Sequence, residues 1–336
     1  MGFLELGVPG IVCRSFGACR NDGARHSKIV ESLDGDLQSN YATGHSRMRL
    51  SREIEKFYKK MKLKPDQTAL LTGASGGLGT YIARALAGYG VNQALVAFPG
   101  KDLPPLKEEI EKNGINAYYL VADLRIREER QRVVADVGKT FGQIDILINN
   151  AGVEFTAPYH ALSEDEIDSV IAVNLEAPMH LTRLIIPQML QRGSGHIVNM
   201  SSLAGKAGPA YQEPYAATKS GLIAFTMALR ETYLRSGVSA SAICPGFVEA
   251  GIYARLKKTS GCSAPALLGT SRPEKVGEAV IRAIQNDIPQ VIINPYPVRP
   301  LFALSEISPR LGAWIARAMG ASQFFKRVYE AQKSRG

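Results

Sequence analysis

The sequence predicts an α/β fold in which a doubly wound parallel sheet of about seven strands carries helices on both faces. Short apolar runs alternate with longer stretches of amphipathic, helical spacing, and consecutive parallel strands need such helices as crossover connections. The segment 65–295 contains no internal repeat and no long low-complexity linker. We therefore expect one domain over residues 65–298, between an N-terminal extension and a C-terminal helical extension.

The expected strands are short runs rich in apolar and β-branched residues. They cover residues 68–72, 93–98, 117–121, 144–149, 196–200, 239–244 and 290–294. The stretches between them have helical spacing, and two of the longest are 163–190 and 213–236. Strands and crossovers together account for the whole central segment.

Both ends of the chain are expected to lie outside this domain. Residues 1–64 form a basic N-terminal extension that is predicted to be partly disordered, with an amphipathic helix near 47–64. Residues 299–336 form a basic amphipathic C-terminal extension that prolines divide into helical pieces. This second extension either packs on the domain or a partner subunit, or lies on a membrane surface or over a lipophilic substrate channel.

Charge is distributed unevenly along the chain. Residues 1–64 hold twelve basic and seven acidic side chains, and residues 299–336 hold seven basic and two acidic ones. The segment between them holds twenty-one basic and twenty-two acidic side chains. The central body is therefore close to neutral, which argues against nucleic acid as a partner. Four scattered cysteines form neither a disulfide framework nor a metal site. Without a secretory signal or membrane span, the expected location is cytoplasmic, with membrane association if residues 299–336 contact lipid.

A glycine-rich loop connects the first expected strand to a helix. It reads Thr72-Gly73-Ala-Ser75-Gly-Gly77-Leu78-Gly79. Glycines at such a turn let the backbone approach a pyrophosphate closely, while the free N–H groups of the helix start point at the anion. The loop therefore predicts a dinucleotide site.

Tyr215 and Lys219 stand four residues apart in a predicted helix, thirteen and seventeen residues after Ser202. Four residues make just over one helical turn, so the phenol and the ammonium share a face. A neighbouring cation favours the phenolate and is expected to lower the pKa of Tyr215. This pair is suited to moving a proton on or off an alcohol oxygen.

Seven motifs in a fixed order give the central segment a family resemblance. They are Thr72-Gly73-x-x-x-Gly77-x-Gly79, Asp123-Leu124, Asn149-Asn150-Ala151-Gly152, Asn174, Ser202, Tyr215-x-x-x-Lys219 and Pro245-Gly246. Residues 65–295 resemble a compact, single-domain short-chain dehydrogenase/reductase, whose Rossmann-type fold agrees with the strand pattern. The resemblance implies hydride transfer between a nicotinamide and a carbonyl or secondary alcohol. It covers neither basic end.

The resemblance also implies roles for four residues. Tyr215 would be the acid/base, Lys219 would lower its pKa and hold the nicotinamide ribose, and Ser202 would donate a hydrogen bond to the substrate oxygen. Asn174 would hold a water that relays protons, or it would satisfy a backbone kink inside its helix. The neighbouring Ser201 is not expected to take part.

The cofactor-binding set follows from the same resemblance. It comprises Thr72, Gly73, Ser75, Gly77, Leu78, Gly79, Asp123, Leu124, Asn150, Ala151, Gly152, Tyr215, Lys219, Pro245 and Gly246. Asp123 would bind the adenine amino group or cap a helix, and Asn150 would line the cleft or shape a turn. Ala250 stands where the family often has threonine, so Ile252 or backbone must hold the nicotinamide end. No metal is expected.

The expected cofactor is NADP or NAD. NADP is favoured because no carboxylate ends the second strand and Lys101 is the nearest cation, although Asp102 stands beside it. Residues 250–272 occupy the segment that covers substrate in the family, and they mix apolar with basic side chains. The expected substrate is a hydrophobic carbonyl or alcohol. Alternatives are a 3-oxoacyl substrate, or a nucleotide-binding scaffold without turnover. The resemblance further implies a homodimer through 163–190 and 213–236.

Overall fold

The computed structural model describes residues 61–334. The predicted N-terminal extension and its helix near 47–64 lie outside the described residues, except for residues 61–64, which are not helical. The described residues belong to one compact unit, so the C-terminal helices are part of the same unit as the sheet.

A seven-stranded, fully parallel sheet forms the centre of this unit, as predicted. Its strands are β1 (Thr68–Thr72), β2 (Asn92–Ala97), β3 (Ala117–Val121), β4 (Ile146–Asn149), β5 (Gly195–Met200), β6 (Val238–Pro245) and β7 (Gln290–Ile293). The strand order is β3-β2-β1-β4-β5-β6-β7. Successive strands are added toward one edge from β1 to β3 and toward the other edge from β4 to β7, so the order reverses between β1 and β4. Ligands of such sheets bind outside the carboxyl ends of the strands at this reversal.

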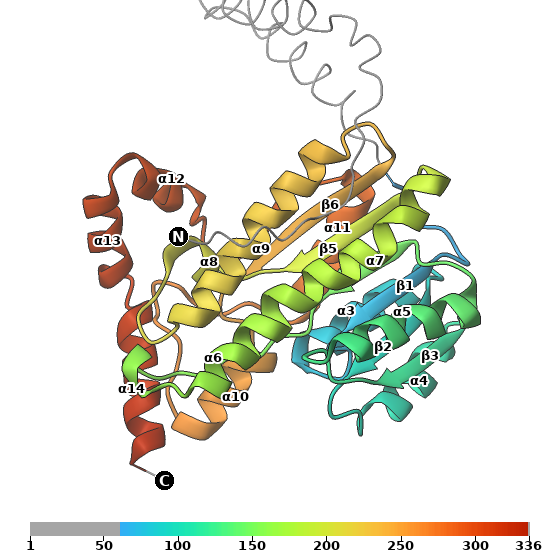
Figure 1. Cartoon of the computed structure of the whole chain (residues 1–336). Coiled ribbons are helices and arrows are strands. Elements are labelled where there is room, and N and C mark those ends of the chain that lie inside the picture. The colour runs from blue at the N-terminus through green and yellow to red at the C-terminus, as the bar shows by residue number, and fades with distance from the viewer. Residues whose placement is uncertain (1–60, 335–336) are drawn as a thin grey trace, which may run out of the picture. The chain divides into compact units, whose positions relative to one another are not determined.

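Helices cover both faces of the sheet (Figure 1). The crossover helices are α3 (Gly77–Ala87), α4 (Leu103–Glu111), α5 (Arg127–Phe141), α6 (Glu164–Ile171), α7 (Ala177–Arg192), α9 (Glu213–Thr232) and α11 (Glu274–Asn286). Two hydrophobic clusters lie on opposite sides of the strands, one with α3, α4 and α11 and the other with α5 and α7. Neighbouring residues Leu70 and Leu71 fall into different clusters, because successive side chains of a strand point to opposite faces. Burial on both faces explains the unbroken apolar runs.

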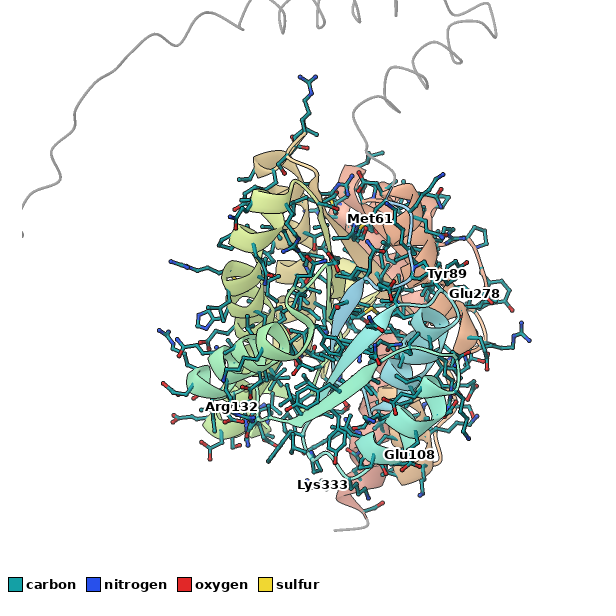
Figure 2. All side chains as sticks on the ribbon, turned by 90° about the vertical axis from the view of Figure 1, so that its right-hand side faces the viewer. Met61, Tyr89, Glu108, Arg132, Glu278 and Lys333 are labelled. Carbon is teal, nitrogen blue, oxygen red and sulfur yellow. The ribbon has the colours of Figure 1, made fainter. Side chains whose placement is uncertain are left out.

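Figure 2 looks toward the β3 edge and shows the same two layers through their outer side chains. Arg132 of α5 lies on one side of the sheet, and Glu108 of α4 and Glu278 of α11 lie on the other. The charged side chains of the crossover helices thus project away from the strands.

The predicted helical stretch 163–190 is interrupted in the structure. Helix α6 passes into a π-helical turn at Ala172–Glu176, where the Ala177 N–H donates to the Ala172 carbonyl five residues back, and α7 follows. The second stretch, predicted over 213–236, ends as α9 at Thr232. Arg235 and Gly237 have φ values of 65° and 86°, so the helix does not continue there.

Short elements surround the carboxyl edge of the sheet. They are two short helices, Tyr159–Ala161 and α8 (Ala204–Ala207), then α10 (Gly251–Ser260), α12 (Arg299–Ile307), α13 (Pro309–Ala318) and α14 (Ala321–Lys333). Proline stands in the first turn of both α12 and α13, where its missing N–H has no helical partner. Figure 1 shows α12 and α13 together beyond α8, and α14 beside α10. The C-terminal extension is therefore three helices that pack on the domain.

Among residues 61–334, no helix is long and apolar enough to cross a membrane. The same segment holds no group of three His, Cys, Asp or Glu side chains that could bind a metal ion.

Candidate active site

A cavity of about 1090 Å³ opens at the carboxyl edge of the sheet, over the reversal between β1 and β4. The glycine loop, the ends of several strands, α9, α10 and the C-terminal helices all contribute to its wall. The predicted site residues that line it are Gly73, Ser75, Gly77, Leu78, Asp123, Leu124, Asn150, Ala151, Gly152, Ser202, Tyr215, Lys219, Pro245 and Gly246. Three predicted residues lie behind the wall: Thr72, Gly79 and Asn174. The parallel register explains the convergence, because each of these strands ends at the same edge.

Thr72 holds the glycine loop against the end of β4. Its hydroxyl accepts hydrogen bonds from the backbone N–H groups of Asn150 at 3.0 Å and Ala151 at 3.1 Å. The Asn150 amide in turn donates to the carbonyls of Thr72 at 3.1 Å and Gly73 at 3.0 Å. Asn150 thus shapes the turn and also lines the cavity, as both of its predicted readings require.

Three glycines of the loop, Gly73, Gly77 and Gly79, stand where no side chain fits. An added Cβ would lie 2.7 Å from the Ala151 Cα at Gly73, and 2.1 Å from the Gly73 carbonyl oxygen at Gly79. Helix α3 begins at Gly77 without a side-chain cap, at the cavity wall. Uncapped N–H groups in a close-packed glycine turn form a surface that fits a pyrophosphate.

Ser202, Tyr215 and Lys219 meet at the opposite part of the cavity. The Lys219 ammonium lies 5.6 Å from the centre of the Tyr215 ring and donates to the Met200 carbonyl at 2.8 Å. The Ser202 hydroxyl accepts from the Ala204 N–H at 3.1 Å, and it is close enough to Tyr215 to influence the pKa of the phenol. Ser201 instead donates to the Lys219 carbonyl at 2.7 Å and is buried, which leaves Ser202 as the serine facing Tyr215.

The pKa of Tyr215 moves in the direction opposite to the one the spacing predicted. Burial raises this pKa to about 12, against a smaller lowering by the Ser202 hydroxyl. Burial also lowers the pKa of Lys219 to about 8. Spacing reveals that two side chains share a helix face, but it does not reveal how much solvent they lose. Here that loss is the larger effect.

Asn174 sits fully buried in the π-helical turn. Its side-chain oxygen accepts from the Val153 N–H at 2.8 Å, and its amide donates to the Val153 carbonyl at 2.9 Å. These bonds fix the segment that carries Gly152 beside Lys219, since a Cβ on Gly152 would lie 3.5 Å from the Lys219 nitrogen. The backbone that Asn174 satisfies therefore belongs to the segment after β4 and not to its own helix.

Asp123 forms a bidentate ion pair with Arg125, with its shortest contact at 2.6 Å. The hydrogen bonds from this guanidinium hold the pKa of Asp123 below its ordinary value. Arg125 also lines the cavity, whereas Lys101, the predicted nearest cation, does not. The cation that lines the cavity at this end therefore follows β3 and not β2.

The C-terminal extension contributes to the cavity wall. Its apolar residues Leu301, Phe302, Ile315 and Met319 line the cavity. This agrees with the alternative in which the extension lies over a substrate channel. Arg255 lines the cavity from α10, and its partner Glu154 follows the Asn149–Gly152 motif by two residues.

Comparison with known proteins agrees with this geometry. The family model described as short chain dehydrogenase matches residues 67–261. "Ketoacyl reductase HetN" of Nostoc sp. is 39% identical over 269 residues, which cover 79% of this chain and 93% of that protein. "D-beta-hydroxybutyrate dehydrogenase" of Cupriavidus necator is 36% identical over 54% of this chain and 70% of that protein.

Two solved structures of short-chain oxidoreductases are also similar to this chain. A metagenomic short-chain oxidoreductase in complex with NADP has a TM-score of 0.60 and 31% identity, covering 70% of this chain and 100% of that one. A putative short-chain alcohol dehydrogenase from Sinorhizobium meliloti has a TM-score of 0.61 and 28% identity, covering 68% and 94%. The fold, the order of the motifs and these relatives together show that the chain belongs to the short-chain dehydrogenase/reductase family of oxidoreductases.

Proposed function

We propose that this oxidoreductase transfers a hydride between NADP and the carbonyl or secondary alcohol carbon of an apolar substrate. The single observation that carries the proposal is the shared cavity. One part presents the glycine loop and the start of α3, another presents Ser202, Tyr215 and Lys219, and a third is apolar. A dinucleotide, a reacting oxygen and an apolar substrate body each have a matching surface.

The proposed chemistry assigns one task to each polar side chain. The bound cofactor supplies or accepts the hydride. During reduction, the Tyr215 hydroxyl would donate its proton to the substrate oxygen, and the Ser202 hydroxyl would hydrogen-bond that oxygen as negative charge develops. Burial keeps the pKa of Tyr215 at about 12, so the proton donor is present at neutral pH. Lys219 would hold the nicotinamide ribose.

Replacing Tyr215 with Phe tests the enzyme proposal. We expect turnover to fall by about 10²-fold or more, since the proton donor is lost while the ring remains. Cofactor affinity, measured by calorimetry, should stay within about twofold because the phenol oxygen is a minor contact. The matched control is Tyr89→Phe, whose side chain is 45% exposed after α3 and should behave like wild type.

Two results would contradict this proposal. Turnover retained by Tyr215→Phe would remove the tyrosine from the reaction. Nucleotide binding by the wild type without turnover on any carbonyl substrate would favour the scaffold alternative instead.

The preference for NADP is supported by the charges around the adenosine end. The second strand ends without a carboxylate, and the exposed Arg125 lines the cavity nearby. Arg125→Ala should raise the KM for NADPH by about tenfold and leave the KM for NADH unchanged, because only NADPH carries the 2′-phosphate. Lys139→Ala, on the helix α5 that follows Arg125, is the control. A wild-type preference for NAD would refute the assignment.

The apolar substrate is supported by the part of the wall that the C-terminal helices supply. Relatives named ketoacyl reductase and 3-oxoacyl-[acyl-carrier-protein] reductase make a 3-oxoacyl compound the leading alternative. A series of 3-oxoacyl thioesters of increasing chain length, compared with steroid and small polar ketones, would separate these classes. We expect KM to fall with chain length, since each buried methylene contributes about 0.8 kcal/mol. Activity on small polar ketones alone would exclude an apolar substrate.

Homodimer formation is proposed from the outer faces of the segments 163–190 and 213–236. On the first segment Ile171, Met179, Leu184 and Leu190 are exposed, each by 36 to 43%, and on the second Leu234 is 44% exposed. Paired across a two-fold axis, these side chains would be buried. Sedimentation velocity should give a dimer, and Leu184→Lys should yield monomers. A monomeric wild type at micromolar concentration would argue against this interface.

Contact of residues 299–336 with a membrane surface is proposed from exposed apolar side chains among basic ones. Ile307 is 81% exposed and Trp314 is 64% exposed, with Arg310 and Arg317 also exposed on α13. Co-sedimentation with phosphatidylserine vesicles should therefore exceed that with phosphatidylcholine vesicles. The double variant Ile307→Ser/Trp314→Ser should lose this binding, whereas Tyr89→Ser should keep it. Equal binding by all three proteins would refute the contact.

A further inference from the structure

A buried carboxylate lies between the catalytic helix and the segment over the cavity. The Glu154 side chain is 1% exposed. Its Oε1 accepts two hydrogen bonds, one from the Gln212 amide at 2.7 Å and one from the Thr156 hydroxyl. Its other oxygen lies 3.0 Å from the Arg255 guanidinium, which also donates to the Glu154 carbonyl at 3.1 Å. Every oxygen of this carboxylate is thus engaged.

The partners of Glu154 come from different parts of the fold. Gln212 caps the start of α9, three residues before Tyr215, and its carbonyl accepts from the Ala216 N–H at 2.7 Å. Arg255 stands in the middle of α10 and lines the cavity. One carboxylate therefore joins the loop after β4, the N-terminus of α9 and the helix α10. The Arg255 side chain is 54% exposed, whereas that of Glu154 is buried. Removing Arg255 would therefore leave a buried carboxylate without its charged partner.

The pair also acts on Tyr215 electrostatically. Burial is the main cause of its raised pKa, but the Glu154 charge raises this pKa further and the Arg255 charge lowers it. Other ionisable groups around the same cavity or beside Tyr215 are Lys219 and Glu213 on α9, Lys206 on α8, Cys244 on β6 and Arg317 on α13. Glu154 and Arg255 have opposite effects, so together they leave little net charge at the tyrosine.

We propose that Glu154 and Arg255 are a positioning pair, which clasps α10 to the N-terminus of the catalytic helix and keeps the charge beside Tyr215 balanced. The proposal rests on the proposed function for its effect on Tyr215. The clasp itself rests only on the contacts. Neither residue needs to touch the reacting atoms, because both act through the placement of α10 and through the tyrosine.

The pH dependence of reduction tests the charge balance. Reduction needs protonated Tyr215. The fall of kcat that follows the tyrosine lies above the pH range in which Lys219 loses its proton, because the pKa of Tyr215 is about 12 and that of Lys219 about 8. Glu154→Gln removes a charge that favours the protonated form, so this fall should move to lower pH, by about half a unit or more. Arg255→Met removes the opposing charge, so the fall should move to higher pH. The double variant Glu154→Gln/Arg255→Met should return close to wild type.

Opposite shifts distinguish this role from a merely structural one, because general loosening of the fold would move both variants the same way. Shifts of the same sign, or none, would overturn the charge balance. Glu154→Gln preserves the shape of the side chain, so it keeps the test usable if Arg255→Met does not fold.

Hydrogen–deuterium exchange tests the clasp without any turnover. Backbone amides of residues 251–260 should exchange at least several-fold faster in Glu154→Gln and in Arg255→Met than in wild type. The matched control is Glu249→Gln, which breaks an exposed ion pair between Glu249 and Lys257, also on α10, at 3.3 Å. Its exchange should equal that of wild type.

Unchanged exchange in both clasp variants would overturn the clasp, whatever the activity. Failure of the proposed function has a different signature. In that case Tyr215→Phe would keep full turnover, while the exchange of residues 251–260 would still respond to Glu154→Gln.

Discussion

At Gly77 an added Cβ would lie 2.1 Å from the backbone nitrogen of Gly251, where α10 begins. The phosphate loop and the helix over the cavity are therefore in direct backbone contact. At Gly138, inside α5, an added Cβ would meet no atom within 4 Å. The two glycines differ in what surrounds them, although both stand in helices. Only the first is required by close packing.

Gly77→Ala should therefore displace either the loop or the start of α10. We expect kcat/KM to fall on the order of 10²-fold, because a shift of about 1 Å at a positioned site has effects of this size. Gly138→Ala should instead raise the free energy of unfolding by about 0.5–1 kcal/mol, since alanine is the better helix former. Steady-state kinetics and urea unfolding would measure both. Full activity in Gly77→Ala would show that the backbone at this contact can shift without disturbing the site.

The buried His196 should make the free energy of unfolding depend on pH. It is buried in β5 with a ring nitrogen 2.9 Å from the Ser241 hydroxyl, and burial lowers its pKa from 6.5 to about 4. Between these values the unfolded chain binds a proton that the folded protein does not. The associated stability is complete above pH 6.5 and is lost as the pH falls toward 4.

Urea unfolding at pH 7.5 and pH 4.5 measures this loss. For wild type, His196 should make the free energy of unfolding about 3 kcal/mol smaller at the lower pH. His196→Gln should remove that part of the difference, and the exposed His160→Gln should keep it. Identical pH dependence in wild type and His196→Gln would contradict the assignment.

The site residues that follow strand ends were predictable from the sequence, because the carboxyl ends of parallel strands lie at one edge of the sheet. Glu154 was not predicted as a functional residue. That carboxylate meets Gln212 and Arg255, which are 58 and 101 residues away in the chain. Such partners depend on the packing of separate segments. The pKa direction of Tyr215 was wrong for a related reason, since burial cannot be seen in spacing.

At the scale of elements, the π-helical turn links the core to the site. Asn174 there makes two hydrogen bonds to the Val153 backbone. Asn174→Ala should lower the free energy of unfolding by about 1–3 kcal/mol, because the partly buried Val153 N–H and carbonyl lose their partners. It should also lower kcat, since Gly152 and Lys219 lie against this segment.

The control for this prediction is Asn113→Ala. Asn113 is exposed after α4 and makes one local bond to the Ile110 carbonyl at 3.1 Å. Its replacement should change the free energy of unfolding by no more than about 0.5 kcal/mol. An equal effect of both variants in urea unfolding would show that the π turn does not depend on Asn174.

Strands were predictable to within about two residues, because apolar runs end sharply at glycine, proline or polar residues. Helix interruptions were not. The stretch 163–190 has continuous helical spacing, and the π turn arises from a bond to Val153 in another segment. In the C-terminal extension, Pro300 and Pro309 revealed the breaks, but nothing local revealed which surface the helices would cover.

At the scale of the whole molecule, α14 attaches the C-terminal extension to the body. Phe324 is fully buried, with its ring centre 5.0 Å from that of Phe247 and 6.1 Å from that of Tyr253 on α10. Leu256, Phe325 and Val328 complete this third hydrophobic cluster. A hydrogen bond from the Ala210 N–H to the Ser322 hydroxyl at 3.2 Å adds a contact to the loop before α9. The extension is thereby part of the cavity.

Phe324→Ala should lower the free energy of unfolding by about 3–5 kcal/mol. Alternatively, it should weaken the packing of α14 on α10 by a similar free energy. Either way the KM for an apolar substrate should rise, because the wall formed by the C-terminal helices is no longer held. Ile307→Ala is the control, since that side chain is 81% exposed. Urea unfolding and substrate kinetics would measure both. Unchanged KM in Phe324→Ala would separate the extension from substrate binding.

The chain contains one tryptophan, Trp314, and it stands on α13, the helix that supplies Ala313, Ile315 and Ala316 to the cavity wall. All indole emission of the protein therefore originates in the C-terminal extension. Reduced nicotinamide absorbs where indole emits, so a bound cofactor would quench Trp314 by energy transfer. Movement of these helices can thus be followed optically in the unlabelled protein, with the side chain itself as the reporter.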